Sequence, residues 1–417
     1  MNSAAPTRWT DGSMNKRLRR RYASERLFRF LGLAAVGISV LFLAFLLYTM
    51  AAKGLGGFIH YEAALPIDFT RSDLFLDPAS LRGPDARQNV ASADLESAIS
   101  KAAVAAYGPA ASEMFGDGAV NSLTTTIVAN PDLLGGRTTL WLPVGSKLDM
   151  AAKDGGDDQT QRVVDALQSH HAVRRTFNLP FLTASDSTDP SSVGIWGALK
   201  GSFLTIIVTM LLAFPVGVLA AVYLEEFAAR NRWTDAIEVS INNLAAVPSI
   251  IFGLLGLAVF LNIMNLPRSA PLVGGLTLAL MTMPVIVIAG RNAIKTVPPS
   301  IRDAALGVGA SKMQVTFHHV LPLALPGILT GTIIGLARAL GETAPLLMIG
   351  MRAFIAAPPG GFTDPATVLP VQIFLWSDEV DRGFVEKTSA AIIVLLLFML
   401  LMNGLAIYLR NRFERRW

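Results

Sequence analysis

The fold is decided by residues 299–345, which read PSIRDAALGVGASKMQVTFHHVLPLALPGILTGTIIGLARALGETAP. The first half of this stretch is polar and helix-compatible, and it closes at Leu321-Pro322. The second half is an apolar helix, long enough to cross a bilayer, that carries Arg338 and Glu342 in its interior. A short polar segment that leads into a charged transmembrane helix suggests a device that passes force from outside the membrane to a site within it.

Composition places this stretch in a membrane protein. Of the 417 residues, 52% are hydrophobic and only 16% are charged, whereas soluble domains typically carry about 25% charged residues. Residues 53–195 hold 17 acidic and 11 basic side chains, so the excess of positive charge lies in the remainder. Basic residues beside apolar segments usually mark the cytoplasmic side rather than a nucleic-acid site. The absence of cysteine excludes disulfides, thiol catalysis and cysteine-ligated metals.

Six apolar segments approach the roughly 20 residues that a membrane-spanning helix needs. We expect the spans at residues 27–52, 196–224, 241–264, 272–289, 326–350 and 390–409. The first follows a basic segment, 1–26, and we interpret it as an uncleaved helix, since a signal peptide has a shorter apolar core of roughly 7–15 residues. The basic cluster predicts a cytoplasmic N-terminus, and six crossings return the C-terminus to that side. The predicted external segments are 53–195 and 351–389, and the internal ones are 225–240 and 290–325.

Residues 53–195 are predicted to form a separate α/β-type external domain between the first two spans. They contain no apolar run of spanning length, and glycine and proline pairs interrupt them repeatedly. We expect a strand at 137–144, a short helix at 163–173 and a linker at 186–192. His170-His171 has no third ligand at a metal-binding spacing, so no metal site is predicted.

Three prolines indicate that the spans pack as a bundle. Pro215, Pro248 and Pro284 lie in or near predicted span interiors, where neighbouring helices must satisfy the carbonyls that proline frees. Arg291, at the inner end of its span, is expected to be a snorkelling anchor. Residues 225–240 fit either a short amphipathic helix or a plain connecting loop.

The segment 300–317 is compatible with two short helices. Apolar residues at 301, 305, 308 and 315 share roughly one face, and Gly307 and Gly309 interrupt the middle. We therefore expect two helices joined by a glycine turn, although the periodicity alone favours an ordinary cytoplasmic loop.

A small-residue stripe marks the next helix. Gly327, Gly331 and Gly335 recur at intervals of four, which permits close helix–helix approach. Arg338 lies seven residues after Gly331, and Glu342 lies seven after Gly335. Because seven residues return to within about 20° of the same helix face, both charges are predicted on the packed side. Arg338 would then lie about 18 Å into its span, close to mid-membrane.

This pair is interpreted as functional because ionisable residues within a membrane usually mark a pathway. An isolated arginine there costs roughly 2.5–3.5 kcal/mol, and Glu342 at i+4 can neutralise it. The alternative is a buried ion pair that only fixes helix packing. An arginine can bind a tetrahedral oxyanion in bidentate fashion, and Glu342 could accept a proton from a protonated one or gate Arg338.

The polar segment resembles the EAA loop of binding-protein-dependent ABC importer permeases. The matching residues are Asp303, Ala304, Ala305 and Gly309, followed by Leu321 and Pro322. In that family the loop forms coupling helices that dock on the ATP-binding subunit, so the resemblance assigns these residues to ATPase coupling. Asp303 stands where glutamate is usual. His319 stands where an aliphatic residue is usual, which bears on the packing of the second coupling helix.

The run RALGETAPLL, residues 338–347, resembles the signature of the PstA family of phosphate ABC transporter permeases, as do residues 247–254 and 201–226. The resemblance covers 196–417 and, more loosely, the first helix, but not 53–195. It implies an all-α membrane protein of six transmembrane helices with type I ABC importer permease architecture, in the bacterial inner membrane, with Arg338 and Glu342 on the phosphate pathway. The large insert between helices 1 and 2 departs from the family, and it either docks the binding protein or is a tolerated insertion.

The resemblance also implies partners. These are a homologous PstC-like permease, a PstB-like ATP-binding subunit dimer and a PstS-like periplasmic phosphate-binding protein, with membrane lipid and no nucleic acid. The chain lacks a G-x-x-x-x-G-K-[ST] loop, so it is expected to be a transport subunit that binds no cofactor, with ATP and Mg on the partner. Two alternatives are an importer of another oxyanion (sulfate, molybdate or phosphonate) and a membrane sensor or scaffold that uses the external domain.

Overall fold

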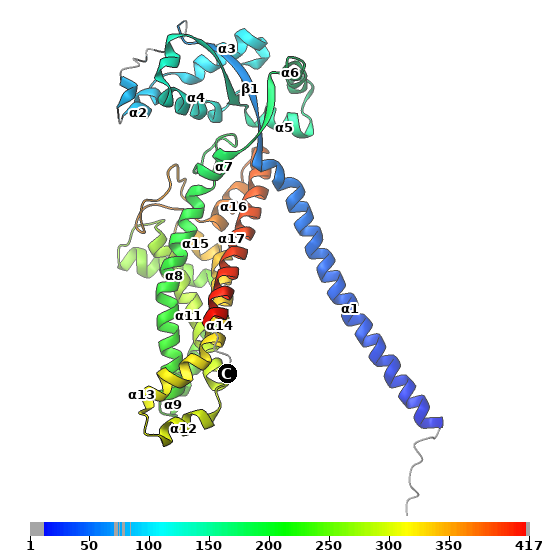
Figure 1. The fold of residues 1–417 in the computed structure, drawn as a ribbon, viewed down its shortest axis with the longest axis vertical. Coiled ribbons are helices and arrows are strands. Elements are labelled where there is room, and N and C mark those ends of the chain that lie inside the picture. The colour runs from blue at the N-terminus through cyan, green and yellow to red at the C-terminus, as the bar shows by residue number, and fades with distance from the viewer. Residues whose placement is uncertain (1–11, 71–73, 75, 77–79, 84, 414–417) are drawn as a thin grey trace, which may run out of the picture. The chain divides into compact units, whose positions relative to one another are not determined.

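The computed structural model describes the chain except residues 1–11, 71–73, 75, 77–79, 84 and 414–417. Within the described residues, five helices are long and apolar enough to cross a membrane, and a bent pair of shorter helices supplies a sixth candidate. The fold is therefore the predicted helical membrane fold with a small sheet in the N-terminal half (Figure 1). The chain forms two compact units, residues 1–53 and 54–417.

The first unit consists of helix α1 (Gly12–Gly54), whose last residue belongs to the second unit. The predicted span 27–52 lies within it, but the helix begins at Gly12 because the basic segment before the span is also helical. Glu25 and Arg29 form an i,i+4 ion pair of 2.5 Å in that segment, an arrangement that supports a polar helix.

The second unit begins with an α/β domain, residues 59–177. Its sheet is antiparallel in the order β2-β1-β3, formed by β1 (Ile59–Asp68), β2 (Arg137–Pro143) and β3 (Val173–Phe177). The buried positions of β1 alternate, and Ala63, Leu65 and Ile67 face a core built with the helices. The helices are η1 (Leu55–Phe58), η2 (Ser80–Arg82), α2 (Ala86–Ala91), α3 (Leu95–Tyr107), η3 (Pro109–Ala111), α4 (Asp117–Ala129), η4 (Pro131–Gly135), α5 (Ser146–Asp154) and α6 (Asp158–Ser169).

Of the strand and the helix predicted in this domain, the strand is found as predicted and the helix ends earlier than predicted. The strand predicted at 137–144 is confirmed as β2. The helix predicted at 163–173 is α6, which ends at Ser169, because His171 adopts a positive φ of 51° and turns the chain into β3.

The predicted linker 186–192 is an irregular loop without helix or strand, but it is bonded on both sides. Asp186 accepts a hydrogen bond from Trp376 Nε1 (3.0 Å), and Asp189 accepts one from the backbone N–H of Asp117 (2.7 Å) at the start of α4. Short helix α7 (Leu179–Thr183) precedes the loop and shares an aromatic core with the last two helices, in which Phe181, Trp376 and Phe384 are buried. The α/β core thus ends near residue 172, and residues 178–195 belong to the packing of the bundle.

The bundle contains α8 (Trp196–Val222), α11 (Pro271–Lys295), α14 (Leu321–Gly341) and α17 (Gly383–Phe413). Helix α11 packs against both α8 and α14, and α14 packs against α17. Shorter helices complete it: η5 (Tyr223–Phe227), α9 (Arg232–Ala245), α10 (Ser249–Gly256), η6 (Leu257–Ile263), α12 (Pro299–Gly307), α13 (Lys312–Gln314), η7 (Val315–Val320), α15 (Ala344–Met348) and α16 (Leu369–Ser377). We call the end beside the α/β domain the domain end, and the end that carries α12 and α13 the loop end.

The span predicted at 241–264 is not one straight helix. Helix α9 ends at Ala245, and the helical run α10–η6 begins at Ser249 after a bend of 100°. Pro248 explains the break, because a proline disfavours the α conformation of the residue before it. The alternative of a helix within 225–240 is confirmed in its second half, where α9 begins at Arg232.

The span predicted at 326–350 is displaced. Helical structure starts at Lys312 and continues through η7 into α14, which ends at Gly341. Pro326 therefore lies inside α14 rather than at its start. Thr330 Oγ1 donates a hydrogen bond to the carbonyl of Pro326 (2.8 Å), the i−4 bond that a threonine side chain commonly makes within a helix.

Candidate functional site

The loop end is built from two short helices that meet at a glycine turn. Helix α12 ends at Gly307, and Gly309 adopts a φ of +90°, a conformation that favours glycine. Ser311 then caps α13 through a reciprocal capping box with Gln314. The glycine turn expected from the sequence is confirmed, whereas the second helix continues without a stop through η7 into α14, so that Leu321 and Pro322 form the first turn of α14.

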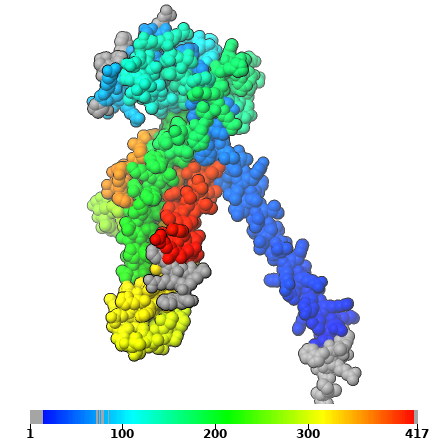
Figure 2. All heavy atoms as spheres, viewed as in Figure 1, coloured from blue at the N-terminus to red at the C-terminus, as the bar shows by residue number. Residues whose placement is uncertain are grey.

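The predicted coupling residues divide between an exposed and a buried face. Asp303, Ala304 and Gly309 are exposed, whereas Ala305 is buried. Beside the exposed residues lies an apolar patch that consists of Leu306, Val308, Met313 and Phe317, of which Val308 is 87% exposed. In Figure 2 these yellow segments form one continuous surface at the loop end. Large apolar side chains gathered on a polar loop indicate a protein-binding surface.

Ion pairs hold this loop to the rest of the bundle. Arg302 of α12 bonds Glu226 (2.8 Å) and also donates to the carbonyls of Ile294 (3.0 Å) and Val297 (2.7 Å) at the end of α11. Arg302 therefore fixes α12 against η5, which follows α8, and against the end of α11.

The snorkelling role predicted for Arg291 is wrong. Its side chain is largely buried and bonds Glu225 (3.2 Å) and Glu238 (2.8 Å). It therefore ties α11 to η5 and α9. The sequence analysis missed the acidic partners because they follow an apolar span and resemble ordinary interfacial charges, although the pair Glu225-Glu226 was a signal.

The glycine stripe of α14 packs against α11. A Cβ atom on Gly331 would overlap Ala289, one on Gly327 would lie 2.7 Å from the Cβ of Ala293, and one on Gly335 would lie 3.0 Å from Thr282. The approaches at Gly327 and Gly331 are closer than real Cβ contacts, and the one at Gly335 is tighter than most of them, so the two helices come together where α14 has no side chains.

Arg338 and Glu342 lie together, but not as the sequence predicted. Arg338 Nε is 3.3 Å from Glu342 Oε1, with 50% of the arginine side chain and 18% of the glutamate side chain exposed. Helix α14 ends at Gly341, so Glu342 has left the helix in an extended conformation, and Arg338 is near the helix end rather than in mid-span. Leu336, Ala339 and Leu340 fill the buried positions of this turn, and the longer arginine extends outward.

At the domain end, a cluster of buried charges joins the α/β domain to α17. Lys153 of α5 bonds Asp149 (2.7 Å) and Glu386 of α17 (3.0 Å), and it also donates to the carbonyls of Gly56 and Ile59. Lys387 is 4% exposed, and its Nζ lies 5.6 Å from the ring centroid of Phe181. Two ammonium groups and two carboxylates thus balance each other in a region that water barely reaches.

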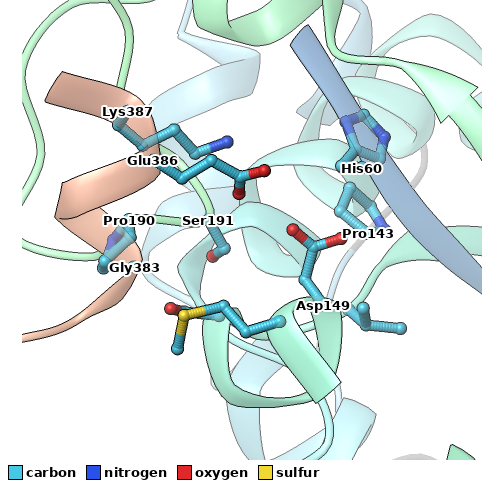
Figure 3. A pocket seen from close by; sticks show the side chains of 11 residues that line it. His60, Pro143, Asp149, Pro190, Ser191, Gly383, Glu386 and Lys387 are labelled. Carbon is cyan, nitrogen blue, oxygen red and sulfur yellow. The ribbon is translucent and has the colours of Figure 1, made fainter. Parts of the chain in front are cut away.

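Figure 3 shows a small cavity beside this cluster, whose lining includes Glu386, Lys387, His60 and Asp149. The cavity volume is about 10 Å³, enough for one water molecule. Within the described residues no group of histidine, cysteine and acidic side chains could hold a metal ion. The sequence analysis missed the cluster, whose signal was the Glu386-Lys387 pair beside an apolar run.

Two carboxyl groups near this junction have displaced pKa values. Burial raises the pKa of Asp186 above its ordinary value, against the hydrogen bond from Trp376. For Glu62, burial acts to raise the pKa, but the hydrogen bonds from His60 and Arg174 outweigh it and leave the pKa lowered. Glu62 is therefore held charged on β1, where Arg174 Nη2 lies 2.6 Å from its Oε2.

Comparison with known proteins gives two family matches. Residues 213–417 match the binding-protein-dependent transport system inner membrane component, and residues 15–162 match a domain of unknown function, DUF3333. Neither match covers residues 163–212.

Individual relatives match the permease region. The probable ABC transporter permease protein YqgI of Bacillus subtilis is 34% identical over 44% of this chain and 61% of its own length. The phosphate transport system permease protein PstA of Yersinia pestis is 31% identical over 51% of this chain and 71% of its own length. The matched segment spans between 50% and 79% of the length of such relatives. An inward-facing structure of the MetNI methionine ABC transporter matches with 20% identity and a TM-score of 0.42, covering 53% of this chain and 95% of that chain.

A helical bundle with several spans, together with these matches, defines a multi-pass permease of the inner membrane. The chain belongs to the family of binding-protein-dependent ABC importer permeases, and proteins named as the phosphate permease PstA are among its relatives.

Proposed function

We propose that this chain is the transmembrane permease subunit of an ATP-driven phosphate importer, which moves inorganic phosphate from periplasm to cytoplasm by alternating access. The observation that carries the proposal is the half-exposed Arg338 beside Glu342, in a chain whose relatives are named phosphate transport permeases. A guanidinium suits a tetrahedral oxyanion because it can donate two parallel hydrogen bonds.

In this proposal both termini and the loop end face the cytoplasm, and the α/β domain lies outside. The basic residues before the first span and after the last support this orientation. The apolar patch of Leu306, Val308, Met313 and Phe317 would then meet a dimer of ATP-binding subunits, which would carry ATP and Mg. A homologous permease and a periplasmic phosphate-binding protein would complete the transporter.

The loop end supports a route for the force that ATP binding would produce. Helix α12 is fixed to η5 and to the end of α11 by Arg302, and α13 runs through η7 into α14 without a break. Movement of the loop would therefore shift α14 and, with it, Arg338. Access to Arg338 would alternate as the bundle changes shape.

Co-purification from membranes tests the proposal, because it identifies the partners directly. We expect the tagged chain to retain a second permease, an ATP-binding subunit and, at high phosphate, a phosphate-binding protein. Val308→Asp should release the ATP-binding subunit while the two permeases remain together. Recovery of the chain alone, or with partners of another transport class, would contradict the proposal.

A second candidate is an importer of sulfate, molybdate or phosphonate, because Arg338 fits any tetrahedral oxyanion. The relatives named for phosphate transport favour phosphate.

A further inference from the structure

Two large apolar side chains point outward where the α/β domain meets the bundle. Phe177, the last residue of β3, and Leu179, the first residue of α7, are each 58% exposed. Asn178 between them is buried, caps α7 by accepting from the backbone N–H of Phe181 (3.1 Å) and donates to the carbonyl of Gly57 (3.3 Å). The backbone is therefore fixed at this point, and both side chains are held away from the protein.

These side chains lie at the level where the spans begin. The backbone N–H groups of Ile195 and Trp196 bond the carbonyls of Phe181 and Ala184, which joins α7 to the first turn of α8. Trp196 itself is 44% exposed, and exposed tryptophans at span ends typically mark a membrane–water interface. Figure 1 shows α7 between the base of the α/β domain and the upper end of α8.

A positively charged side chain, Arg175, lies farther from the bundle than Phe177 and Leu179. Arg175 and Phe177 are two residues apart on β3, so they share a face of the strand and lie about 7 Å apart along it. Arg175 is exposed and forms no ion pair with another described residue. Arg174, on the opposite face, is instead engaged by Glu62 and by the Trp141 ring. Apolar groups with a cation farther from the bundle match the order of acyl chains and phosphates at a bilayer surface.

We propose that the α/β domain rests on the outer leaflet of the membrane, with Phe177 and Leu179 inserted at the headgroup boundary and Arg175 bound to lipid phosphates. This inference rests on the proposed function only for the leaflet, because the outer side follows from that orientation. In this arrangement the partner of the α/β domain is a lipid surface, which restricts the orientation of the domain relative to the bundle. The interaction should strengthen with anionic lipid because Arg175 supplies an unpaired positive charge.

The natural absence of cysteine permits a direct test with single spin labels on the full chain. Spin labels are attached to the variants Phe177→Cys and Leu179→Cys in lipid vesicles. Ser169→Cys on α6 is the control for a label in water, and Leu401→Cys, exposed on α17, is the control for a label in lipid. Collision of each label with oxygen, which concentrates in lipid, is compared with collision with a water-soluble nickel complex. We expect the oxygen-to-nickel ratio at 177 and 179 to exceed that at 169 several-fold.

A ratio at 177 and 179 equal to that at 169 would overturn the inference. Low collision with both reagents would also overturn it, because protein rather than lipid would then cover the patch. Adding phosphatidylglycerol to phosphatidylcholine vesicles should raise the oxygen-to-nickel ratio of the label at 177 when no other residue is changed. The same rise is expected with Arg137→Gln, an exposed control on β2, but not with Arg175→Gln. An unchanged response in Arg175→Gln would contradict the role of the arginine. None of these measurements depends on the transported anion, so failure here is distinguishable from failure of the proposed function.

Discussion

The guanidinium of Arg338 contacts Glu342 and is also accessible at the surface of α14. Its Nε lies 3.3 Å from the carboxylate, and half of the side chain is exposed. It can therefore offer hydrogen bonds to an anion without first breaking a fully buried ion pair. Glu342, less exposed and outside the helix, can hold the arginine in place or take it back when the anion leaves.

Replacement of Arg338 should separate charge from geometry. Arg338→Lys keeps the charge but loses the planar pair of donors, and Arg338→Gln loses both. We expect initial rates of labelled phosphate uptake in the order native, lysine, glutamine, with the glutamine variant reduced by about tenfold or more, since hydrogen bonds to charged groups contribute about 1.5–3 kcal/mol. Equal amounts of each variant in the membrane are the control. Native uptake by Arg338→Gln would remove Arg338 from the pathway.

Asp186 gives a prediction about pH. Burial raises the pKa of its carboxyl group, so the charged form is disfavoured in the folded protein, and stability is lost as pH rises through the ordinary aspartate pKa of about 3.9 towards the raised value. Asp186→Asn keeps an acceptor for Trp376 and avoids the charge. We expect Asp186→Asn to have the same Tm as the native protein at low pH and a higher Tm than the native protein at neutral pH. A lower Tm at neutral pH would show that the charge is stabilising.

The residue scale shows what sequence spacing can predict. The i,i+4 spacing placed Arg338 and Glu342 together, and the structure places them in contact. The spacing did not give their depth or exposure, because both depend on where the helix ends. Gly341 and Pro345 are signals for that end, but the predicted span runs through them to residue 350. The partners of Arg291 and Arg302 come from helices about 50 to 80 residues away. The sequence shows the acidic pair Glu225-Glu226, but local patterns do not show which arginines it meets.

At the scale of elements, the contact between α11 and α14 depends on the absence of side chains. Gly331→Ala should destabilise the protein by about 1–3 kcal/mol, because the added methyl overlaps Ala289 in a packed interface. The matched control is Gly404→Ala on α17, where an added Cβ meets nothing within 4 Å, so it should be neutral or slightly stabilising. Thermal unfolding in detergent measures both.

A second substitution tests the same contact from the other side. Ala289→Gly removes the atom that the new methyl would meet, so it should restore part of the stability of Gly331→Ala. Independent, additive effects of the two substitutions would contradict direct contact between these positions.

Elements were predictable where one pattern dominates. Long apolar runs gave the helices α1, α8, α11 and α17. The bend between α9 and α10 was missed because Pro248 was assigned to the interior of a continuous span, where proline can also be tolerated. The start of α14 was placed too late because the histidines and threonine of η7 resemble a loop, while the backbone satisfies its hydrogen bonds there in a π-helical turn.

At the scale of the whole molecule, the cluster around Lys153 fastens the α/β domain to α17. Glu386→Gln leaves Lys153 and Lys387 with one carboxylate fewer in a region of low exposure. We expect a loss of about 2 kcal/mol, below the 3–5 kcal/mol of a fully buried pair because some water reaches the site. Hydrogen exchange should accelerate at α5 and at the first turn of α17.

Glu113→Gln provides the matched control, because the pair that Glu113 forms with Lys147 at 4.0 Å is exposed. It should leave exchange unchanged. If Glu386→Gln behaves like this control, the α/β domain is held by apolar packing, and the charges are incidental.

The organisation of the molecule could be foreseen only in part. Composition separated residues 53–195 from the spans, and the domain core indeed lies between residues 63 and 172. The tight junction could not be foreseen, because the loop 186–192 has the composition of a linker and acquires its role through bonds to Trp376 and Asp117. Those partners lie 190 and 72 residues away along the chain.

The central claim, that this chain forms the path of a phosphate importer, is tested most directly by transport with purified components. The complex that co-purifies with the chain is placed in liposomes, and entry of labelled phosphate is measured with and without ATP. We predict ATP-dependent uptake that unlabelled phosphate suppresses and that equal concentrations of sulfate, molybdate or phosphonate leave nearly unchanged. Uptake that one of those anions suppresses as well as phosphate does, or an absence of ATP-dependent phosphate entry in an intact complex, would contradict the claim.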